Sequence, residues 1–579
     1  MPRLSRLPAL FFVIGLVAAP AVLAEPVGNQ FEISTVGPPG DSRFDADDPR
    51  VAFGASGGLV VYTGTATLDE QEVFGRPVDA GGNPSGPQRR LTFVGDAGDT
   101  GPEARNPDVA FNSRAGEFLL VWSGIPTAPN DEDIFAQRVA TSGQRLGDPV
   151  QVSQAGGVGP GSDGDNQRPR VAYNPQNDEY LVVWRDNRNG TGGVIRGQRL
   201  LGVSAAETGD DDFFVSDPAT SDTNRVDVEY GSAGNEFLVV FDNDIGGGED
   251  EIVAQRVSAT GGVSPETQVS QQGPAGDSDF DVDRPAVAYG AGEFLVAWVG
   301  DRTADEEQEI YVQRLSVSGQ EIGADSQVST QGADGDPDFD ADRPALTHDA
   351  AANEYVVTWQ GTRFFDVPAG DGEEEIFAQR LNATAGEIGE NDFRVSNQGV
   401  DGDPDFDAQS PAVAYSPAGG VRLIVWRGTR SFDTVNAAFE FEIFGRRERA
   451  PATVVAPTST APATAPGQPA APKPAAALKP SDVIRLRSAR RCVSRRAFRI
   501  RLRQPSGVTL VRATVSVNGK RVRVLRGRRL TAPVVLRGLP KGRFTVRIVV
   551  TTSTGKRLTA QRRYRTCARK RAAGRTPRI

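Results

Sequence analysis

Four short apolar runs follow one another in a fixed order along most of the chain, and polar turns separate them. The copy that opens at Pro285 reads PAVAY, FLVAW and EIYVQRL, and its fourth run ends in Val-Ser. The runs are rich in Val, Ile and aromatic residues, and Gly, Asn, Asp or Pro bound them, which is the pattern of strands joined by turns. Because the order returns about every 60 residues, we expect a repeated four-stranded unit.

Seven copies of this unit follow one another. Their first runs open at Pro49, Pro107, Pro169, Val226, Pro285, Pro344 and Pro411. Their second runs end at Tyr62, Trp122, Trp184, Phe241, Trp298, Trp359 and Trp426, so all five tryptophans of the chain occupy one repeat position. A large aromatic side chain in every copy favours packing between neighbouring units over ligand binding by any one of them.

The two ends of the repeated region indicate a closed ring. The seventh copy stops after its third run, near Glu448, while a lone fourth-run pattern, FEISTVG, stands ahead of the first copy at Phe31 to Gly37. Self-similar four-stranded units that stack radially form a β-propeller. If the lone run pairs with the last unit, no strand edge stays open. The sequence therefore predicts an all-β fold, a seven-bladed β-propeller over residues 25–450 that an N-terminal strand closes.

Three other segments differ in composition from the propeller. Residues 1–24 carry Arg3 and Arg6, an apolar run and a small-residue end, which predict a cleaved signal peptide; the alternative, a membrane anchor, is disfavoured because the run is short for a span. Residues 451–480 are almost wholly Ala, Pro, Thr and Val and predict an extended linker. Residues 481–579 alternate apolar and polar positions around Asn518-Gly519 and Lys541-Gly542, which predicts a small immunoglobulin-like β-sandwich with a disordered tail.

The net charge of −11 conceals an acidic body and a basic tail. After residue 480 there are 30 Lys and Arg against one acid, Asp482, which gives +29 and leaves 34 basic against 74 acidic residues, or −40, for the remainder. We expect the basic domain to contact an anionic surface polymer or the propeller itself, and not nucleic acid, because the aromatic residues of single-strand binders are missing. The only two cysteines, Cys492 and Cys567, predict a disulfide across this domain in an exported chain.

Aspartates at alternate positions mark four of the links between copies. They are Asp277, Asp279, Asp281 and Asp283; Asp336, Asp338, Asp340 and Asp342; Asp403, Asp405 and Asp407; and, ahead of the first copy, Asp41, Asp45 and Asp47. In an extended segment these carboxylates project to one side, and oxygen-rich loops of this kind suit Ca²⁺. The alternatives are ion pairs with arginines of a neighbouring blade and plain solvated loops. Ring closure makes the four links neighbours, because they enter blades five, six, seven and one.

Two resemblances add to these expectations. The chain from residue 31 to 450 resembles the VAY/LVVW/IFAQR repeats of secreted bacterial proteins, and its aspartate spacing distantly resembles the loops of integrin-type FG-GAP propellers, although their Phe-Gly and Gly-Ala-Pro signature is missing. The stretches Leu536–Val546 and Tyr564–Cys567 are similar to the C-terminal β-domains of actinobacterial exported proteins. These resemblances imply extracellular or surface display and bring no catalytic residues.

Residues suited to catalysis are scarce. His348 is the only histidine, at a position where the other copies carry Tyr or Phe, which favours a structural role and excludes a zinc site built from several histidines. Acids are abundant and a glycosidase needs only two of them, but no pair stands out from the repeated ones. We expect a site acid, if there is one, to be unique to one blade and to converge on the central channel.

These observations favour an exported, non-enzymatic binding or adhesion scaffold, stabilised by Ca²⁺ and secreted or associated with the cell wall. Its expected partners are an extracellular protein or polysaccharide ligand, with no nucleic acid and no membrane span after signal cleavage. The alternative is a carboxylate-dependent glycoside hydrolase or polysaccharide lyase of propeller fold. No catalytic residue is assigned at this point.

Overall fold

The computed structural model describes residues 25–38, 41–67, 70–94, 103–125, 132–153, 166–187, 193–219, 221–246, 249–272, 280, 282–301, 308–331, 340–362, 373–398, 406–433, 438–449, 483–485, 498–503, 510–517, 520–526, 534–536, 543–552 and 557–566. The chain divides into two units, Val22–Thr453 and one that contains Val454–Ile579. The predicted signal peptide and the predicted linker lie outside the described residues. No described helix is long and apolar enough to cross a membrane.

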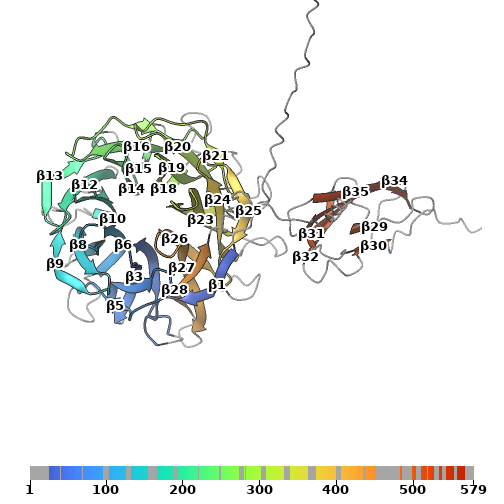
Figure 1. Cartoon of the computed structure of the whole chain (residues 1–579), viewed down its shortest axis with the longest axis horizontal. Helices are drawn as coiled ribbons and strands as arrows, with labels where there is room; N and C mark the ends of the chain where they lie inside the picture. The colour runs from blue at the N-terminus through green and yellow to red at the C-terminus, as the bar shows by residue number, and fades with distance from the viewer. Residues whose placement is uncertain are drawn as a thin grey trace, which may run out of the picture. The chain divides into compact units, whose positions relative to one another are not determined.

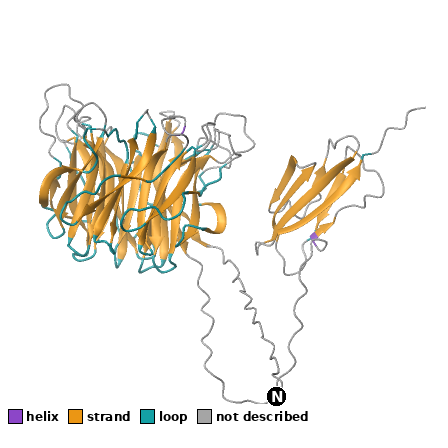
Figure 2. Cartoon of the chain, turned by 90° about the horizontal axis from the view of Figure 1, so that it is seen from above, coloured by secondary structure: helices purple, strands orange, loops and turns teal. Residues whose placement is uncertain are grey.

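The unit Val22–Thr453 is the predicted seven-bladed propeller (Figure 1). Each blade is a four-stranded antiparallel sheet, and Figure 2 shows the strands running side by side between the two faces of the ring. The innermost, first strands are β2 (Ala46–Phe53), β6 (Glu103–Asn112), β10 (Asn166–Asn174), β14 (Val226–Gly231), β18 (Val282–Gly290), β22 (Ala341–Asp349) and β26 (Ala408–Ser416). The second strands are β3 (Gly57–Thr67), β7 (Glu117–Ile125), β11 (Glu179–Asp186), β15 (Glu236–Asp244), β19 (Glu293–Gly300), β23 (Glu354–Thr362) and β27 (Val421–Asp433).

The outer half of each blade follows the same order. The third strands are β4 (Glu70–Asp79), β8 (Asp133–Ala140), β12 (Val194–Leu201), β16 (Asp250–Ser258), β20 (Glu309–Leu315), β24 (Glu374–Asn382) and β28 (Ala438–Arg449). The fourth strands are β5 (Arg89–Arg90), β9 (Arg145–Gln151), β13 (Glu207–Phe214), β17 (Thr267–Gln268), β21 (Ser326–Gln327), β25 (Glu387–Arg394) and, for the seventh blade, β1 (Glu25–Glu32). We call the face where the first strands begin the link face, and the opposite one the hairpin face.

The N-terminal strand closes the ring, as predicted. β1 pairs antiparallel with β28, with Phe31 opposite Gly445 and Glu32 opposite Phe444. The pairing continues past the strand, because the N–H of Ile33 donates to the carbonyl of Ile443 at 2.7 Å. The strand begins at Glu25, ahead of the predicted Phe31, with an irregularity after Val27. Closure completes the seventh blade with a strand from the beginning of the chain, which covers the edge of β28 that would otherwise stay open.

The large aromatics that end the second runs form the core between blades. The five tryptophans are at most 3% exposed, and Trp122 stacks on Phe135 of the neighbouring strand with ring centroids 5.7 Å apart. The second strands are buried on both faces because each blade is covered by the next on either side; all but the last residue of β7 are buried. The predicted packing role of these aromatics is confirmed.

The Gln-Arg pairs, which recur in the third runs of five blades, act mainly inside their own blade. Nε2 of Gln137 donates to the carbonyl of Leu146 on the fourth strand at 3.1 Å. Arg138 pairs with Glu117 on the second strand, with 2.6 Å between Nε and Oε1. The same arginine-glutamate pair recurs in other blades as Arg256 with Glu236, Arg314 with Glu293 and Arg380 with Glu354. These polar pairs tie together the strands of one sheet.

The C-terminal unit contains two small sheets, described by themselves. One has the order β29 (Ile484–Arg485), β30 (Phe498–Leu502), β33 (Val534–Leu536); the other has the order β32 (Lys520–Arg526), β31 (Leu510–Val517), β34 (Arg543–Thr552), β35 (Arg557–Arg565). Alternate residues of β31 and β34, such as Val515 and Ile548, form a buried core. Two sheets around one core agree with the expected β-fold, while the immunoglobulin-like assignment stays a prediction. Cys492 and Cys567 lie outside the described residues.

Candidate active site on the ring axis

One position of the first strands carries charges in part of the ring only. The first strands surround the ring axis, and each contacts the first strands of both neighbouring blades, from β2 round to β26 and back (Figure 1). The residue after the proline of each first run, or after Val226 in blade four, is in blade order Arg50, Asp108, Arg170, Asp227, Ala286, Ala345 and Ala412. Blades one to four therefore present alternating positive and negative side chains, whereas blades five to seven present alanine.

These charges converge although they come from four different blades. Burial lowers the pKa of Arg50 to about 10, and the next contributions come from Arg170, which lowers it, and Asp108, which raises it. Asp227, three blades away from Arg50, also interacts with it electrostatically. All four side chains are half-buried. With Glu229, which lies two residues beyond Asp227 on β14, we call them the axial cluster.

Blade four differs from the other six in its backbone. In those six, the first strand carries a register irregularity at the proline, and the residue before the proline has a positive φ, for example 55° at Arg168 and 57° at Arg284. Such a bulge adds one residue and turns the strand. β14 has no proline and pairs with β15 without any register shift. Its residues therefore alternate strictly, and Asp227 and Glu229 project to the same side.

The two aspartates of the cluster are held by the neighbouring blade. The N–H of Val171 donates to Oδ2 of Asp108 at 2.9 Å, and the N–H of Val287 donates to Oδ2 of Asp227 at 2.8 Å. Burial raises the pKa of both carboxyl groups, to about 6 for Asp227, while Arg170 acts in the opposite direction on each. Each aspartate thus has a fixed position, and a hydrogen bond from the backbone N–H of the next residue, Val109 or Val228, also acts to lower its pKa.

Glu229 is the acid that no other blade repeats. The other six blades place Ala or Thr at its position: Ala52, Ala110, Ala172, Ala288, Thr347 and Ala414. Its Oε1 accepts the N–H of Tyr230 at 2.9 Å. Burial, with smaller contributions from the charges of Asp227 and Asp108, raises the pKa of Glu229 to about 8. At neutral pH this side chain holds a proton while its neighbour Asp227 is ionised.

An acid of this kind beside an ionised carboxylate is suited to acid–base chemistry. The two residues are separated by two positions on one strand, which places their Cα atoms about 7 Å apart. Environments that push two pKa values apart assign one group as the proton donor and the other as the base or nucleophile. Their partial exposure shows that solvent reaches them. The arrangement can therefore protonate a leaving oxygen while a second carboxylate acts on the substrate or on water.

The described aspartates of the links have protein partners. The aspartate four residues ahead of the proline accepts a backbone N–H next to or in a third strand of the preceding blade: Phe441 to Asp45 at 2.9 Å, Gln308 to Asp340 at 3.0 Å and Glu374 to Asp407 at 3.0 Å. Burial raises the pKa of Asp407 to about 6. These carboxylates bridge consecutive blades at the link face.

The remaining described link aspartates lie beside arginines. Asp342 accepts a hydrogen bond from Arg284 of the preceding blade, Asp47 lies 3.6 Å from Nη1 of Arg427, Asp283 lies 3.4 Å from Nε of Arg284, and Asp41 pairs with Arg43. No group of three or more His, Cys, Asp or Glu that could hold a metal occurs among the described residues. Asp277, Asp279, Asp281, Asp336, Asp338, Asp403 and Asp405 lie outside the described residues, so calcium binding by the links stays a prediction.

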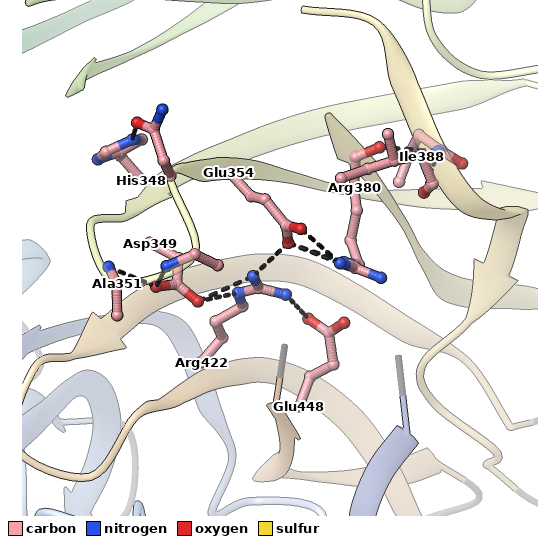
Figure 3. Close-up of polar contacts among 11 residues, drawn as sticks. His348, Asp349, Ala351, Glu354, Arg380, Ile388, Arg422 and Glu448 are labelled. Carbon is pink, nitrogen blue, oxygen red and sulfur yellow. Dashed lines mark hydrogen bonds and ion pairs between the residues drawn. The ribbon is translucent and has the colours of Figure 1, made fainter. Parts of the chain in front are cut away.

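A second cluster of arginine and carboxylate lies between blades six and seven toward the hairpin face (Figure 3). Arg422 is fully buried, and its Nη2 lies 2.8 Å from both Asp349 and Glu354, while Nη1 lies 3.1 Å from Glu448. Arg380 pairs with Glu354 at 2.7 Å. We call Asp349, Glu354, Arg380, Arg422 and Glu448 the interblade network.

His348 lies beside the interblade network. Its ring packs at a tilt of 54° against Tyr355, with 4.8 Å between centroids, and Nε2 lies 3.3 Å from Oδ1 of Asn353. Burial lowers its pKa. The histidine thus takes the place of the aromatic that packs here in other blades, such as Tyr289 on Phe294, in agreement with the structural role expected for it.

Sequence reasoning missed the axial cluster although the signal was present. The run NRVDVEY of blade four departs from the P-x-V-A-Y pattern at two positions, Val226 and Glu229, and places Asp227 at the variable position between them. A comparison of the seven copies position by position shows that only blade four carries an acid at the position of Glu229. It also shows that the position of Arg50 is charged in blades one to four and is alanine in blades five to seven. The abundance of repeated acids in the links drew attention away from it.

No protein-family model matches the chain, and no curated protein sequence matches it. Several solved structures are similar in arrangement. An ulvan lyase, described as a new family of polysaccharide lyase, is 10% identical, with 69% of this chain and 94% of that chain covered and a TM-score of 0.43. An α-L-arabinanase of Penicillium chrysogenum is 12% identical, with 49% and 83% covered and a TM-score of 0.35. A Trypanosoma rangeli sialidase mutant is 10% identical, with 74% and 60% covered and a TM-score of 0.38.

These findings correct the expectation that the protein is not an enzyme. The solved structures that share its arrangement include a lyase, an arabinanase and a sialidase. Identities and scores of this size carry no argument about activity, which has to be argued from the axial cluster of this chain. The resemblance to repeats of secreted bacterial proteins stays a prediction.

Proposed function

We propose that the protein is a carboxylate-dependent glycoside hydrolase or polysaccharide lyase that acts at the axial cluster. The observation that carries the proposal is Glu229, an acid found in one blade only, beside Asp227 on an unbulged strand that faces the ring axis. Six other blades form with Ala or Thr at the position of Glu229, so propeller architecture does not require an acid there. A buried acid that the architecture does not need is a candidate for chemistry.

Each residue has a defined role in either reaction. In hydrolysis, Glu229 donates its proton to the leaving glycosidic oxygen, and ionised Asp227 attacks the anomeric carbon or activates water. In elimination, Asp227 removes the proton beside the sugar carboxylate, and Glu229 protonates the leaving oxygen as the double bond forms. Burial is the main cause of the high pKa of Glu229, and the negative charges of Asp227 and Asp108 add to it.

Export and surface location belong to the same proposal. The N-terminal pattern of residues 1–24 and the resemblance to secreted repeat proteins support an extracellular polysaccharide as substrate. The chain after residue 480 contains 30 basic residues and one acid. This positive charge supports attachment of the C-terminal domain to an anionic surface polymer. Calcium at the links would stabilise the blades and takes no part in the proposed reaction.

The test is cleavage of a polysaccharide panel by the full chain, with reducing ends as the readout for hydrolysis and ultraviolet absorbance of an unsaturated product for elimination. Glu229→Gln should lower kcat by at least about 100-fold, because it removes the proton donor while keeping the shape. Asp392→Asn is the matched control: burial raises the pKa of this carboxyl to about 6 as well, but it lies on the outer strand β25.

The pH dependence gives a second readout. Activity needs Asp227 ionised and Glu229 protonated, so kcat/KM should follow a bell with limbs near the pKa values of about 6 and about 8. Full activity in Glu229→Gln, or a loss equal to that in Asp392→Asn, would contradict the proposal.

A further inference from the structure

The arginines of the axial cluster differ from those of the blade walls in their partners. Arg138, Arg256, Arg314 and Arg380, one third-strand position in four blades, each pair with a glutamate of the second strand. Arg50 and Arg170 form no ion pair with any described residue. Each makes one side-chain hydrogen bond, from Nη1 to the carbonyl of the proline before it, at 2.8 Å. Four donors of each guanidinium group therefore have no acceptor in the part of the chain that the structure describes.

Charge balance alone does not account for this arrangement. Asp108 attracts Arg50 and Arg170 electrostatically. Its Oδ2, however, accepts a hydrogen bond from the N–H of Val171. The two guanidinium groups also repel each other, which contributes to the lowered pKa of Arg50. In the interblade network, arginine and carboxylate atoms lie within 3.1 Å of each other, so this chain does form close ion pairs where they stabilise the packing of two blades. At the axis the arginines are near the acids but remain unpaired.

Arg225 extends this positive row along blade four. It stands two residues ahead of Asp227, at the end of β14 nearest the link face, and is half-buried. Its Nε has no hydrogen-bond partner, and burial, followed by repulsion from Arg168, lowers its pKa to about 10. Arg225, Asp227 and Glu229 thus follow one another at alternate positions, with the cation nearest the link face.

We infer that Arg50 and Arg170 bind an acidic group of a sugar seated at the axial cluster, so that the substrate is an anionic polysaccharide. Guanidinium groups with open donors hold carboxylate or sulfate oxygens through paired, charge-assisted hydrogen bonds. A bound anion also offsets the repulsion between the two arginines. The inference rests on the proposed function for the chemistry that follows binding, although the binding itself is measured without turnover.

The experiment uses the full chain with Glu229→Gln, which binds without cleaving, and titration calorimetry with three short ligands: trigalacturonate, a sulfated galactotriose and unmodified galactotriose. Short ligands are chosen because long polyanions would also bind the basic C-terminal domain. At least one acidic ligand should bind about tenfold more tightly than galactotriose, and added salt should weaken it. The stronger of the two acidic ligands identifies the group, carboxylate or sulfate.

The variants place that affinity at the axis. Adding Arg50→Gln with Arg170→Gln should reduce the affinity for the acidic ligand by at least about tenfold, while Arg43→Gln, which removes a half-exposed arginine of the link face, should leave it unchanged. If the glutamine pair unfolds the protein, Arg50→Lys with Arg170→Lys retains the charge and should still weaken binding, because lysine lacks the planar fork.

Three outcomes would overturn the inference: equal affinity for galactotriose, affinity that the axial variants do not change, or no binding of any of the three ligands. These outcomes are separate from failure of the proposed function. Cleavage of neutral arabinan that depends on Glu229 would support the enzyme and overturn the anionic substrate. Arginine-dependent binding of trigalacturonate by a chain that cleaves nothing would retain the anion site and remove the enzyme.

Discussion

The axial cluster and the interblade network are built from the same two residue types and differ in how they are paired. In the interblade network Arg422 is fully buried and contacts Asp349, Glu354 and Glu448 (Figure 3). In the axial cluster Arg50 and Arg170 are half-buried and influence the acids without contacting them. The first arrangement satisfies its charges internally, whereas the second leaves donors and acceptors open to solvent near the axis.

This difference separates charged residues that stabilise the fold from charged residues that are available to bind a ligand. A buried ion group is tolerated only when its partners surround it, so the interblade network acts on stability. Charges that lie together without pairing cost free energy in the free protein, and a ligand or a reaction has to account for them. Blades five to seven form with alanine at the position where blades one to four carry Arg50, Asp108, Arg170 and Asp227. The ring therefore does not need these charges in order to form.

The largest effect on stability should come from Arg422→Met. The change keeps an unbranched side chain but leaves the carboxylates of Asp349, Glu354 and Glu448 buried without their shared cation. Breaking a buried ion group in this way should lower the free energy of unfolding by about 3–5 kcal/mol, measured by urea denaturation. Activity per folded molecule should be unchanged, because the network lies between blades six and seven.

Glu448→Gln is the matched control within the same network. Burial raises the pKa of Glu448, and its Oε1 has no hydrogen-bond partner, so loss of its charge should change stability by less than about 1 kcal/mol. A small effect of Arg422→Met, or a loss of activity that exceeds the loss of folded protein, would erase the distinction between the two clusters.

A smaller effect should appear in the pH dependence of stability. The folded pKa values of Asp227 and Glu229, about 6 and about 8, exceed the unfolded values of 3.8 and 4.5. The folded protein therefore binds more protons than the unfolded chain, and the stabilisation, fully present below the unfolded pKa values, is lost as pH rises through about 8. Between pH ~5 and pH ~8.5 the melting temperature of the natural chain should fall more than that of Asp227→Asn with Glu229→Gln.

Other buried acids share this trend, and the comparison removes their contribution. Burial raises the pKa of Glu251 and of Glu442 to about 7, so both chains should lose stability toward high pH. Only the difference between the two chains reports on the axial pair. Parallel curves would show that the axial acids titrate as they do in the unfolded chain, which would also remove the proton donor from the proposed reaction.

The fold was predictable because its determinants are local and repeated. Because the strand pattern recurs in seven copies, an atypical residue in one copy does not change the prediction. The lone run at Phe31 predicted ring closure without any knowledge of long-range contacts. The packing role of Trp122 and its counterparts followed from their recurrence. Recurrence alone does not say whether a side chain turns toward its own sheet, as Arg138 does, or toward the next blade.

The site was harder to predict because it is formed by differences between copies. Arg50, Asp108, Arg170 and Asp227 are far apart in sequence and meet only because the ring brings four first strands around one axis. The direction of each side chain further depends on a bulge at the proline, which blade four lacks. The aspartates of the links look like metal ligands in sequence, yet Asp340 and Asp407 accept backbone N–H groups of the preceding blade.

The smallest expected effect is stabilisation of the links by calcium. Calcium should raise the melting temperature by a few degrees, and EDTA should reverse the rise, if it binds the folded links and not the unfolded chain. Asp338→Ala with Asp340→Ala should reduce that shift. Because Asp340 also accepts the N–H of Gln308, the double variant should be less stable even without calcium, so the informative quantity is the calcium-dependent shift and not the melting temperature itself. Asp392→Asn should keep the full shift, and an absence of any change with EDTA in the natural chain would leave hydrogen bonds and ion pairs as the whole role of the acidic links.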